Sequence, residues 1–403
     1  MKINVRVRLS LLMFFQYFIW GSWYVTMGTY ILSSLKADAI QLGSAYANLS
    51  IAAIISPFFV GLIADRFFSA QKVIGVLHLA GAFILYYVST VQDFNSFWWL
   101  ILLYTLLYMP TISLANSISF TQMKDSRKEF PGVRVLGTAG WIISGLLIGF
   151  LDIESSALTF RIAAGASLLL GIFCFFLPNT PPNQEKVKIS SILGLNALVL
   201  FKGRSFTIFF FASILICIPL AFYYGFTNPF LNDIGMQNAA GKMTLGQASE
   251  FIFMLIIPLL FIHLGVKKML LLGMSAWVLR YLFFAFGDID ARMWMLYAGI
   301  ILHGVCYDFF FVTGQIYIDN KAGESIRSAA QGLITFATYG VGLLIGSYVS
   351  GFVTEISAST VNGAINYQWI PVWLIAASIA MFVIVLFFFF FKEKPIIKGE
   401  NIF

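Results

Sequence analysis

Long apolar runs separated by short polar segments dominate the chain. A helix needs about 20 predominantly apolar residues to cross the hydrocarbon core of a bilayer, and twelve runs are close to or beyond that length. Their predicted limits are 9–32, 42–64, 73–91, 97–121, 134–151, 160–177, 205–231, 246–263, 268–287, 292–317, 328–354 and 368–391. The pattern therefore predicts an all-α membrane protein with twelve transmembrane helices.

The most polar stretch between these runs lies near the middle of the chain. It contains Pro181, Pro182, Glu185, Lys186 and Lys188. We predict a cytoplasmic linker at residues 179–204, between a six-helix N-terminal half (1–178) and a six-helix C-terminal half (205–403). A basic turn follows the second helix of each half. This favours two pseudo-symmetric repeats, and transporters built in this way bind substrate at the interface between their repeats.

Composition supports the membrane interpretation. The 403 residues are 60% hydrophobic and only 11% charged, and the mean hydropathy is +0.87. A soluble protein of this length carries far more charge on its surface. The formal net charge of +7 does not indicate nucleic acid as a partner, because the basic residues lie in short loops between apolar runs.

The distribution of lysine and arginine predicts the topology. With both termini in the cytoplasm, 20 of the 25 basic residues fall on the inner side. The other five are Lys36, Arg161, Lys242, Arg280 and Arg292. Cytoplasmic loops of membrane proteins carry such an excess, and an odd number of helices would destroy it.

Nothing in the sequence predicts a metal, a cofactor or an enzyme. The three cysteines, Cys174, Cys217 and Cys306, all lie within apolar runs, where cysteine behaves as a small hydrophobic residue. A membrane-embedded enzyme such as a prenyl transferase would need paired Asp-rich metal sites, and the sequence contains no such cluster. We therefore expect a multi-pass protein that is not an enzyme.

Carboxylates within the apolar runs are the first candidates for function. Gln247 and Glu250 are spaced i, i+3, so both side chains leave one face of the eighth predicted helix. A carboxylate inside a bilayer is costly unless it is protonated, paired or facing a wet cavity. Glu250 is therefore the leading candidate for proton coupling and substrate binding, and the alternative is a buried pair with Arg134 or with another helix.

A second candidate group lies on the fifth predicted helix. Arg134, Thr138 and Trp141 are spaced i, i+4, i+7 and form one stripe that combines a guanidinium, a hydroxyl and an aromatic ring. The stripe predicts a binding wall. The alternative for Arg134 is a side chain that extends from the helix end to the membrane surface. Gly137 and Gly140 beside the stripe predict close helix packing.

A third candidate is Asn228, which precedes Pro229 in the seventh predicted helix. Proline leaves the carbonyl of Gly225 without its helical donor and permits a kink. An amide at this point can bind the donor and acceptor edges of a ligand, or it can satisfy the freed backbone instead.

The tenth predicted helix carries His303, Tyr307 and Asp308. His303 and Tyr307 are spaced i, i+4 and share a face, so we expect both to bind substrate. A hydrogen bond to another helix is the alternative for His303. Asp308 projects roughly 100° away from Tyr307 and is a second candidate for proton coupling. The role of Arg280 in the ninth predicted helix stays open: it is either a counter-ion or a side chain that extends outward.

The chemistry of these side chains favours an uncharged substrate with a flat base and a sugar. Aromatic rings stack on heteroaromatic bases, and amides pair with base edges. A carboxylate and an arginine suit sugar hydroxyls. One basic residue beside one acid argues against a strongly anionic substrate such as a nucleotide. A nucleoside fits best.

The loop after the second predicted helix resembles a known signature. Gly61, Asp65 and Arg66, with Lys72 beyond them, are similar to the loop of the major facilitator superfamily, in which a tight turn and paired charges latch the cytoplasmic gate. Ordinary cytoplasmic positive charge is the alternative. The resemblance implies the major facilitator fold and a gating role for Gly61, Asp65 and Arg66.

Within that superfamily, most of the chain resembles the nucleoside:proton symporter family. The resemblance rests on Gln247-x-x-Glu250, on Asn228-Pro229-Phe230-Leu231, and on Tyr307-Asp308-Phe309-Phe310 with His303 before it. Arg134 with Thr138 and an aromatic residue at 141 also matches. The family pattern favours Tyr at 303, Phe at 141 and 307, and a polar residue at 225. These departures bear on the substrate range.

The resemblance implies proton-coupled nucleoside uptake by alternating access. Arg134, Thr138, Trp141, Asn228, Gln247, Glu250, His303 and Tyr307 would bind substrate, and Glu250 and Asp308 would carry the proton. A proton-coupled sugar symporter and a drug exporter of the same fold are the alternatives. We expect a monomer in a bacterial inner membrane, with the lipid bilayer and a small molecule as partners and a proton as coupling ion.

Overall fold

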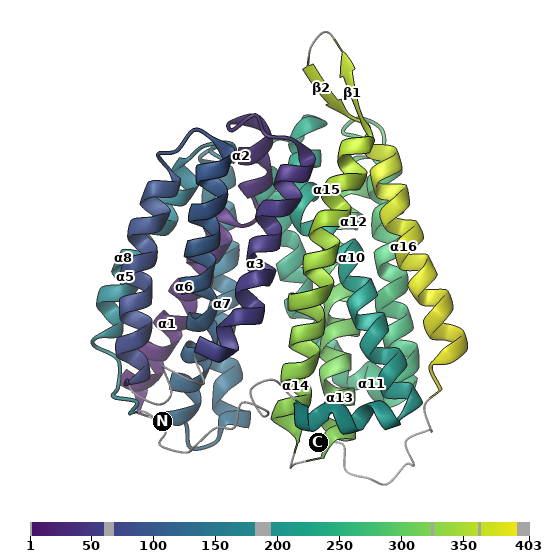
Figure 1. Ribbon diagram of the computed structural model, residues 1–403. Helices are drawn as coiled ribbons and strands as arrows, with labels where there is room; N and C mark the ends of the chain where they lie inside the picture. The colour runs from purple at the N-terminus through teal and green to yellow at the C-terminus, as the bar shows by residue number, and fades with distance from the viewer. Residues whose placement is uncertain (1, 60–67, 182–194, 324–325, 362–363, 393–403) are drawn as a thin grey trace. The chain divides into compact units, whose positions relative to one another are not determined.

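The computed structural model describes residues 2–59, 68–181, 195–323, 326–361 and 364–392 (Figure 1). These residues are mainly helical. They form two compact units. The first unit consists of Met1–Ile192, Ala221–Thr244 and Ser347–Ile356, and the second consists of Leu193–Leu220, Leu245–Gly346 and Ser357–Phe403. The division into halves at the linker 179–204 stays a prediction.

The first unit begins with seven helices. They are α1 (Ile3–Trp23), α2 (Met27–Ser33), α3 (Ala39–Phe59), α5 (Ala70–Val88), α6 (Phe94–Thr121), α7 (Ser126–Phe150) and α8 (Leu158–Cys174). Helix α1 packs against α7 and α8, α5 against α6 and α8, and α3 against α6 (Figure 1). Glycines bring α1 and α7 together as predicted, since a Cβ at Gly140 would clash with the backbone carbonyl of Phe14.

The first membrane segment differs from its prediction as one helix over 9–32. The helix begins at Ile3, so Arg6 and Arg8 lie within it, and it is interrupted between Trp23 and Met27. The Tyr46 hydroxyl explains the interruption. It donates to the Tyr24 carbonyl at 2.7 Å and accepts from the Gly28 N–H at 3.2 Å, so it replaces the helical hydrogen bond between these two residues.

The second unit contains most of the remaining elements. Three helices, α10 (Arg204–Asp233), α11 (Ala239–Phe286) and α15 (Leu343–Ile356), begin in one unit and end in the other. The others are η2 (Leu195–Lys202), α12 (Met293–Tyr307), η3 (Asp308–Val312), α13 (Thr313–Ala322), α14 (Arg327–Thr335), η4 (Phe336–Gly342) and α16 (Trp369–Phe390). A hairpin of β1 (Ala358–Val361) and β2 (Ala364–Tyr367) precedes α16, with Ser359 opposite Asn366 (Figure 1).

One glycine divides α11 at the place where the sequence predicts a loop. The predicted spans 246–263 and 268–287 are consecutive parts of α11, and Gly265 between them has φ 69° and ψ 173°. This conformation is costly for residues with a Cβ, so glycine suits the break. Ile257 before the break and Met269 after it both pack in the cluster around Phe309.

Two π-helical turns interrupt other long helices of the chain. Residues 308–312 form a π turn that begins at Asp308, between α12 and α13. Residues 336–342 form a second one between α14 and α15. A π turn inserts an extra residue into the helical repeat, shifts the direction of the side chains after it, and is frequent at functional sites.

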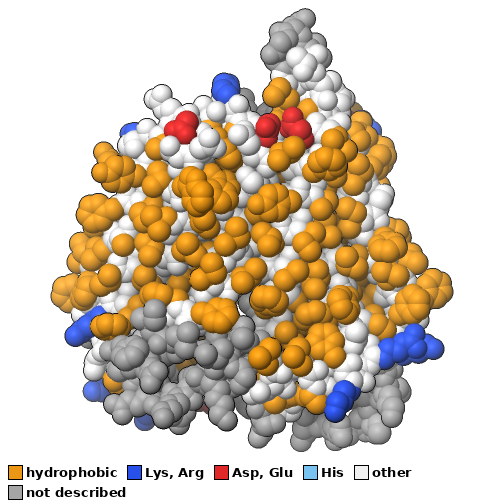
Figure 2. All heavy atoms as spheres, in the orientation of Figure 1, with side chains coloured by type: hydrophobic (Ala, Val, Ile, Leu, Met, Phe, Trp, Pro, Cys, Tyr) orange, Lys and Arg blue, Asp and Glu red, His pale blue; other side chains and the backbone are white. Residues whose placement is uncertain are grey.

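The helix lengths and surface suit a bilayer. Within the described residues, nine helices are long and apolar enough to cross a membrane. Figure 2 shows hydrophobic side chains over most of the visible face, with acidic groups near its upper edge and basic groups mainly near its edges. Large side chains such as Phe83, Leu255 and Phe389 are exposed, and lipid chains would cover such side chains in a bilayer. The protein is a multi-pass membrane protein.

Candidate functional site

The predicted stripe on α7 lies against an aromatic cluster on α1. The guanidinium of Arg134 stacks over the ring of Tyr17, with 4.0 Å between the guanidinium carbon and the ring centroid. This contact is a cation–π interaction within the protein and accounts for the half-buried position of the arginine. Thr138, one turn further along, is also half-buried.

Trp141 extends this aromatic cluster. Its ring centroid lies 5.4 Å from that of Trp20 and 6.4 Å from that of Tyr24, with edge-to-face geometry in both pairs. Tyr24 also contacts Tyr46 at 5.2 Å and Tyr224 of α10 at 5.6 Å. The first unit therefore places Trp141 among rings that can stack on a flat base.

Sequence reasoning missed most of this aromatic cluster. It assigned no role to Tyr17, Trp20, Tyr24 or Tyr46. A signal was present for three of these residues, because Tyr17, Trp20 and Tyr24 follow the i, i+3, i+7 spacing of one helix face. Tyr46 carries no comparable local signal, since its role depends on the break after α1.

A buried polar network packs against the aromatic cluster. His78 of α5 is fully buried, with its two ring nitrogens 2.9 Å from Gln16 Oε1 and 3.1 Å from Ser167 Oγ. Gln16 also donates to Thr111 at 2.6 Å, and its carbonyl accepts from the Tyr108 hydroxyl. The network joins four helices and orders Tyr108, whose ring lies 5.9 Å from Trp20.

Asn228 lies in the first unit, and both ends of its amide have partners. Its Oδ1 accepts from the Thr29 hydroxyl at 2.6 Å, and its Nδ2 donates to Glu154 Oε2 at 2.7 Å. Sequence reasoning did not single out Glu154, which follows α7 in a loop and is 4% exposed. A loop acid has no sequence signal that distinguishes it from a surface charge.

In the second unit, a close helix crossing places Glu250 beside the tenth predicted span. A Cβ on Gly304 of α12 would lie 2.5 Å from the backbone nitrogen of Glu250. Ser249 fixes the crossing, because its hydroxyl donates to the Ile301 carbonyl at 2.7 Å and accepts from the Gly304 N–H at 3.0 Å. Gln247 and Glu250 are both half-buried on α11.

His303 and Tyr307 share one face of α12, as their spacing predicts. Their ring centroids are 5.8 Å apart. His303 is buried, and a Cβ on Gly246 of α11 would lie 3.0 Å from its Cβ. The hydroxyl of Tyr307 forms a hydrogen bond with that of Tyr339 in the π turn η4. Glu250, His303 and Tyr307 therefore all lie within about one helical turn of the crossing of α11 and α12.

Asp308 is fully buried at the start of the π turn η3. Neither of its carboxylate oxygens has a hydrogen-bond partner among the described residues, and it interacts electrostatically with Glu250. The ionised form of such a group is costly, because burial removes its water without supplying donors. The geometry suits a group that takes up and releases a proton.

Arg280 is also fully buried, in the second segment of α11. Its Nε donates to the Gly299 carbonyl at 3.1 Å, and its charge acts on His303 and Cys306. This position decides against a side chain that extends outward. The guanidinium adds a positive charge to the same unit that holds Glu250 and Asp308.

The predicted gating residues Gly61, Asp65 and Arg66 lie outside the described residues. The other predicted residues fall into two groups. Arg134, Thr138, Trp141 and Asn228 belong to the first unit, and Gln247, Glu250, His303, Tyr307 and Asp308 belong to the second. A chamber shared by both groups stays a prediction.

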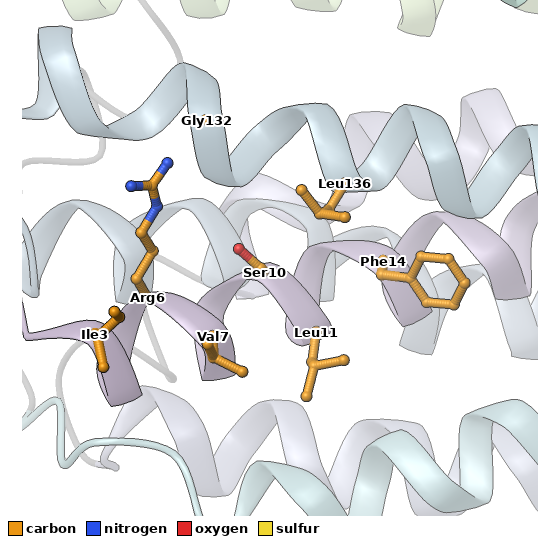
Figure 3. A pocket seen from close by; sticks show the side chains of 8 residues that line it. All are labelled: Ile3, Arg6, Val7, Ser10, Leu11, Phe14, Gly132 and Leu136. Atoms are coloured by element: carbon orange, nitrogen blue, oxygen red, sulfur yellow. The ribbon is translucent and has the colours of Figure 1, made fainter.

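A groove of about 470 Å³ between α1 and α7 is separate from these groups (Figure 3). Val7, Leu11 and Leu136 line it, and Arg6 extends across it toward Gly132. Its lining is almost wholly apolar, and Val7 and Leu11 are exposed. A lipid-facing groove explains this composition, since the groove lacks the amides and acids that a polar solute requires.

Comparisons with known proteins identify the family of the chain. A profile of the family described as nucleoside H+ symporter matches residues 1–395. YegT of Escherichia coli (strain K12) is 46% identical over 97% of this chain and 95% of its own length. Xanthosine permease of the same organism is 35% identical over 97% of this chain and 96% of its own length.

Solved structures show the same relationship. The crystal structure of the nucleoside transporter NupG superposes with a TM-score of 0.89 and 32% sequence identity, covering 97% of this chain and all of that chain. The chain belongs to the nucleoside H+ symporter family. It is therefore a transporter and not an enzyme, and a proton is its coupling ion.

Proposed function

We propose that this member of the nucleoside H+ symporter family brings nucleosides into a bacterial cell across the inner membrane, together with protons, by alternating access. Family membership favours a nucleoside over the sugar and drug alternatives. Two of its relatives are named for xanthosine and nucleoside transport. The aromatic rings around Trp141 and the buried amide of Asn228 supply the stacking and hydrogen-bonding groups that a nucleoside requires.

The proposed topology has twelve spans with both termini in the cytoplasm. Nine described helices have the length and composition of membrane spans. Helices α1 and α8 add two further spans, and the break at Gly265 makes two spans of α11. An even number of spans agrees with the placement of most basic residues on the cytoplasmic side. We propose that the transporter works as a monomer, with one substrate site.

The burial of the Asp308 carboxyl group is the observation that supports the proposed proton coupling. A carboxyl group that is fully buried without hydrogen-bond donors gains little from ionisation unless a conformational change supplies water or a cation. Its electrostatic interaction with Glu250 makes the charge of each group depend on the other. We propose that this pair binds a proton on the outer side and releases it on the inner side.

The other predicted residues complete the proposed site. Arg134, Thr138, Trp141 and Asn228 would bind the nucleoside from the first unit, and Gln247, Glu250, His303 and Tyr307 from the second. Loading with proton and nucleoside would permit the change between outward and inward access, and release of both would permit the return. Gly61, Asp65 and Arg66 are proposed to latch the cytoplasmic gate.

Purified protein in liposomes tests this proposal. With an acidic exterior, wild-type protein should accumulate radiolabelled uridine, and a protonophore should abolish accumulation. Asp308→Asn and Glu250→Gln should lose pH-driven accumulation but keep uridine exchange between the two sides, because exchange needs no net proton movement. Asp290→Asn is the control, since Asp290 is exposed beyond the end of α11.

Two outcomes separate the parts of the proposal. Wild-type protein that neither accumulates nor exchanges any nucleoside would refute nucleoside transport. If Asp308→Asn and Glu250→Gln both reach the wild-type accumulation ratio, the pair is excluded as the coupling site. The proposal of nucleoside transport would stand.

A further inference from the structure

Glu154 accepts hydrogen bonds from three donors and lies outside the predicted set of site residues. It follows α7 in the loop before α8 and is 4% exposed. Its Oε2 accepts from Asn228 Nδ2 at 2.7 Å and from Asn232 Nδ2 at 2.8 Å. Its Oε1 accepts from the backbone N–H of Ala240, at the start of α11, at 2.8 Å. Three donors from two helices therefore converge on one buried carboxylate.

This carboxylate determines which way the Asn228 amide points. An ionised carboxylate only accepts hydrogen bonds, so the NH₂ group of Asn228 must face it. The Thr29 hydroxyl donates to Asn228 Oδ1 at 2.6 Å from the opposite side. A hydroxyl can donate or accept, so Thr29 pairs with whichever end of the amide faces it, and Glu154 decides the orientation. The amide of a predicted substrate-binding residue is thus oriented by Glu154 and held in place by Thr29, two neighbours that the sequence did not indicate.

The remaining hydrogen of Asn228 has a weak partner. Nδ2 lies 3.9 Å from the sulfur of Met243, and a thioether is a poor acceptor. A carbonyl or hydroxyl oxygen of a ligand would replace this contact at little cost. The Met243 side is therefore where the amide can exchange a protein partner for a substrate.

We propose that Glu154 is a positioning residue for nucleoside binding. It acts through Asn228, by keeping the N–H donor of the amide directed toward Met243, where it meets an acceptor on the nucleoside. This inference rests on the proposed function. It assigns Glu154 and Thr29 a role in selecting nucleosides by their hydrogen-bonding pattern.

Glu154→Gln provides the test, because glutamine keeps the size and removes one acceptor. Its amide has one accepting oxygen and one donating NH₂ group, so it cannot accept from all three donors. Turning Asn228 around restores pairing and directs Oδ1 toward Met243. The variant should lose affinity for nucleosides that place a hydrogen-bond acceptor against the Asn228 amide. It should gain relative affinity for nucleosides that place a donor there.

Two pairs of nucleosides have nearly equal shapes, but one member of each pair has a hydrogen-bond acceptor where the other has a donor. Uridine and inosine carry a carbonyl oxygen where cytidine and adenosine carry an amino group. Equilibrium binding to purified protein should show the uridine-to-cytidine or inosine-to-adenosine affinity ratio falling by roughly two- to tenfold in Glu154→Gln, the range that one hydrogen bond supplies. Thermal unfolding of each variant is measured in parallel.

Two matched variants accompany the test. Glu355→Gln changes a similar contact, since Glu355 Oε2 accepts from the Ala39 backbone N–H at 2.9 Å, but it does not contact Asn228. It should leave both ratios unchanged. Thr29→Val removes the hydroxyl that holds Asn228 Oδ1 and should change the uridine-to-cytidine or the inosine-to-adenosine affinity ratio. Thr29→Ser keeps the hydroxyl and should have the wild-type ratios.

The outcomes are distinguishable. Wild-type ratios in Glu154→Gln, or an equal loss of affinity for all four nucleosides, would overturn the positioning role while the proposed function stands. If Glu154→Gln does not fold, the Thr29 pair decides, and equal ratios in Thr29→Val and Thr29→Ser would overturn the role. Wild-type protein that binds none of the four nucleosides would refute both the proposed function and this inference.

Discussion

The crossing of α11 and α12 at Gly304 has no room for a side chain. A Cβ at this position would lie 2.5 Å from the nitrogen of Glu250, 2.6 Å from the carbonyl carbon of Ser249 and 2.7 Å from its oxygen. All three atoms belong to the backbone and cannot rotate away. Ordinary contact begins near 3.4 Å, so Gly304→Ala must separate the two helices locally by about 0.9 Å, the difference between 3.4 and 2.5 Å.

The energetic cost of Gly304→Ala follows from three contributions. Overpacking of a tight contact costs about 1–3 kcal/mol. Separation also weakens the hydrogen bond between the Gly304 N–H and the Ser249 hydroxyl, which contributes about 1 kcal/mol. Alanine recovers about 1 kcal/mol through its higher helix propensity. We expect a net loss of about 1–3 kcal/mol in the free energy of unfolding.

The effect on transport should exceed the effect on stability. The same crossing sets the positions of Glu250, His303 and Tyr307, so separation of the helices moves a proposed proton carrier away from two proposed substrate ligands. We expect Gly304→Ala to lose most uridine accumulation. Ser249→Ala removes the hydroxyl without adding volume, and it should cost about 1 kcal/mol while keeping most of the transport activity.

Unfolding in mixed detergent micelles and uridine uptake in liposomes measure the two effects. Gly165→Ala is the matched control, because no described atom lies within 4 Å of a Cβ at that position in α8. It should be neutral or stabilising by about 0.5–1 kcal/mol. A Gly304→Ala protein that is as stable and as active as Gly165→Ala would refute the close crossing.

Two further predictions concern the break in α11 and the start of α6. Gly265→Ala should destabilise the protein by about 1–2 kcal/mol in the same unfolding assay. The added methyl group meets no described atom within 4 Å, but φ at this position is 69°, which is unfavourable for a residue with a Cβ. A change in stability equal to that of Gly165→Ala would contradict this. Asp93 caps α6 by accepting from the Ser96 N–H at 2.8 Å, and the hydrogen bonds from Ser96 lower the pKa of Asp93. Its contribution is therefore present above the unfolded-state pKa and lost as the pH falls through the folded-state pKa, so Asp93→Ala should lower the melting temperature at pH 7 but not at pH 2. An equal difference at both values would exclude the charged cap.

Much of the architecture could be predicted because membranes restrict the solutions available to a chain. Without water in a bilayer, backbone polar groups are satisfied mainly by the hydrogen bonds of the helix that carries them, so the length of an apolar run indicates the length of a span. The predicted segments around α5, α6, α8 and α16 agree with the helices to within a few residues. The family could be predicted as well, because its motifs are short and local.

Tertiary contacts decided what local pattern could not. The Tyr46 hydroxyl interrupts the first span from a different helix, and the sequence of that span gives no sign of it. His78 is buried because Gln16 and Ser167 supply its partners from α1 and α8. The π turn at Asp308 and the paired strands β1 and β2 were also absent from the prediction.

The sequence by itself determined the membrane class, the family and the residue types available for transport. It placed Asn228, Glu250, His303, Tyr307 and Asp308 within spans, because polar residues stand out in apolar runs. Only the tertiary structure decided which of them have partners. Glu154 shows why: the environment of an acid depends on which donors the fold brings within 3 Å, and those at Asn228, Asn232 and Ala240 lie more than 70 residues away along the chain.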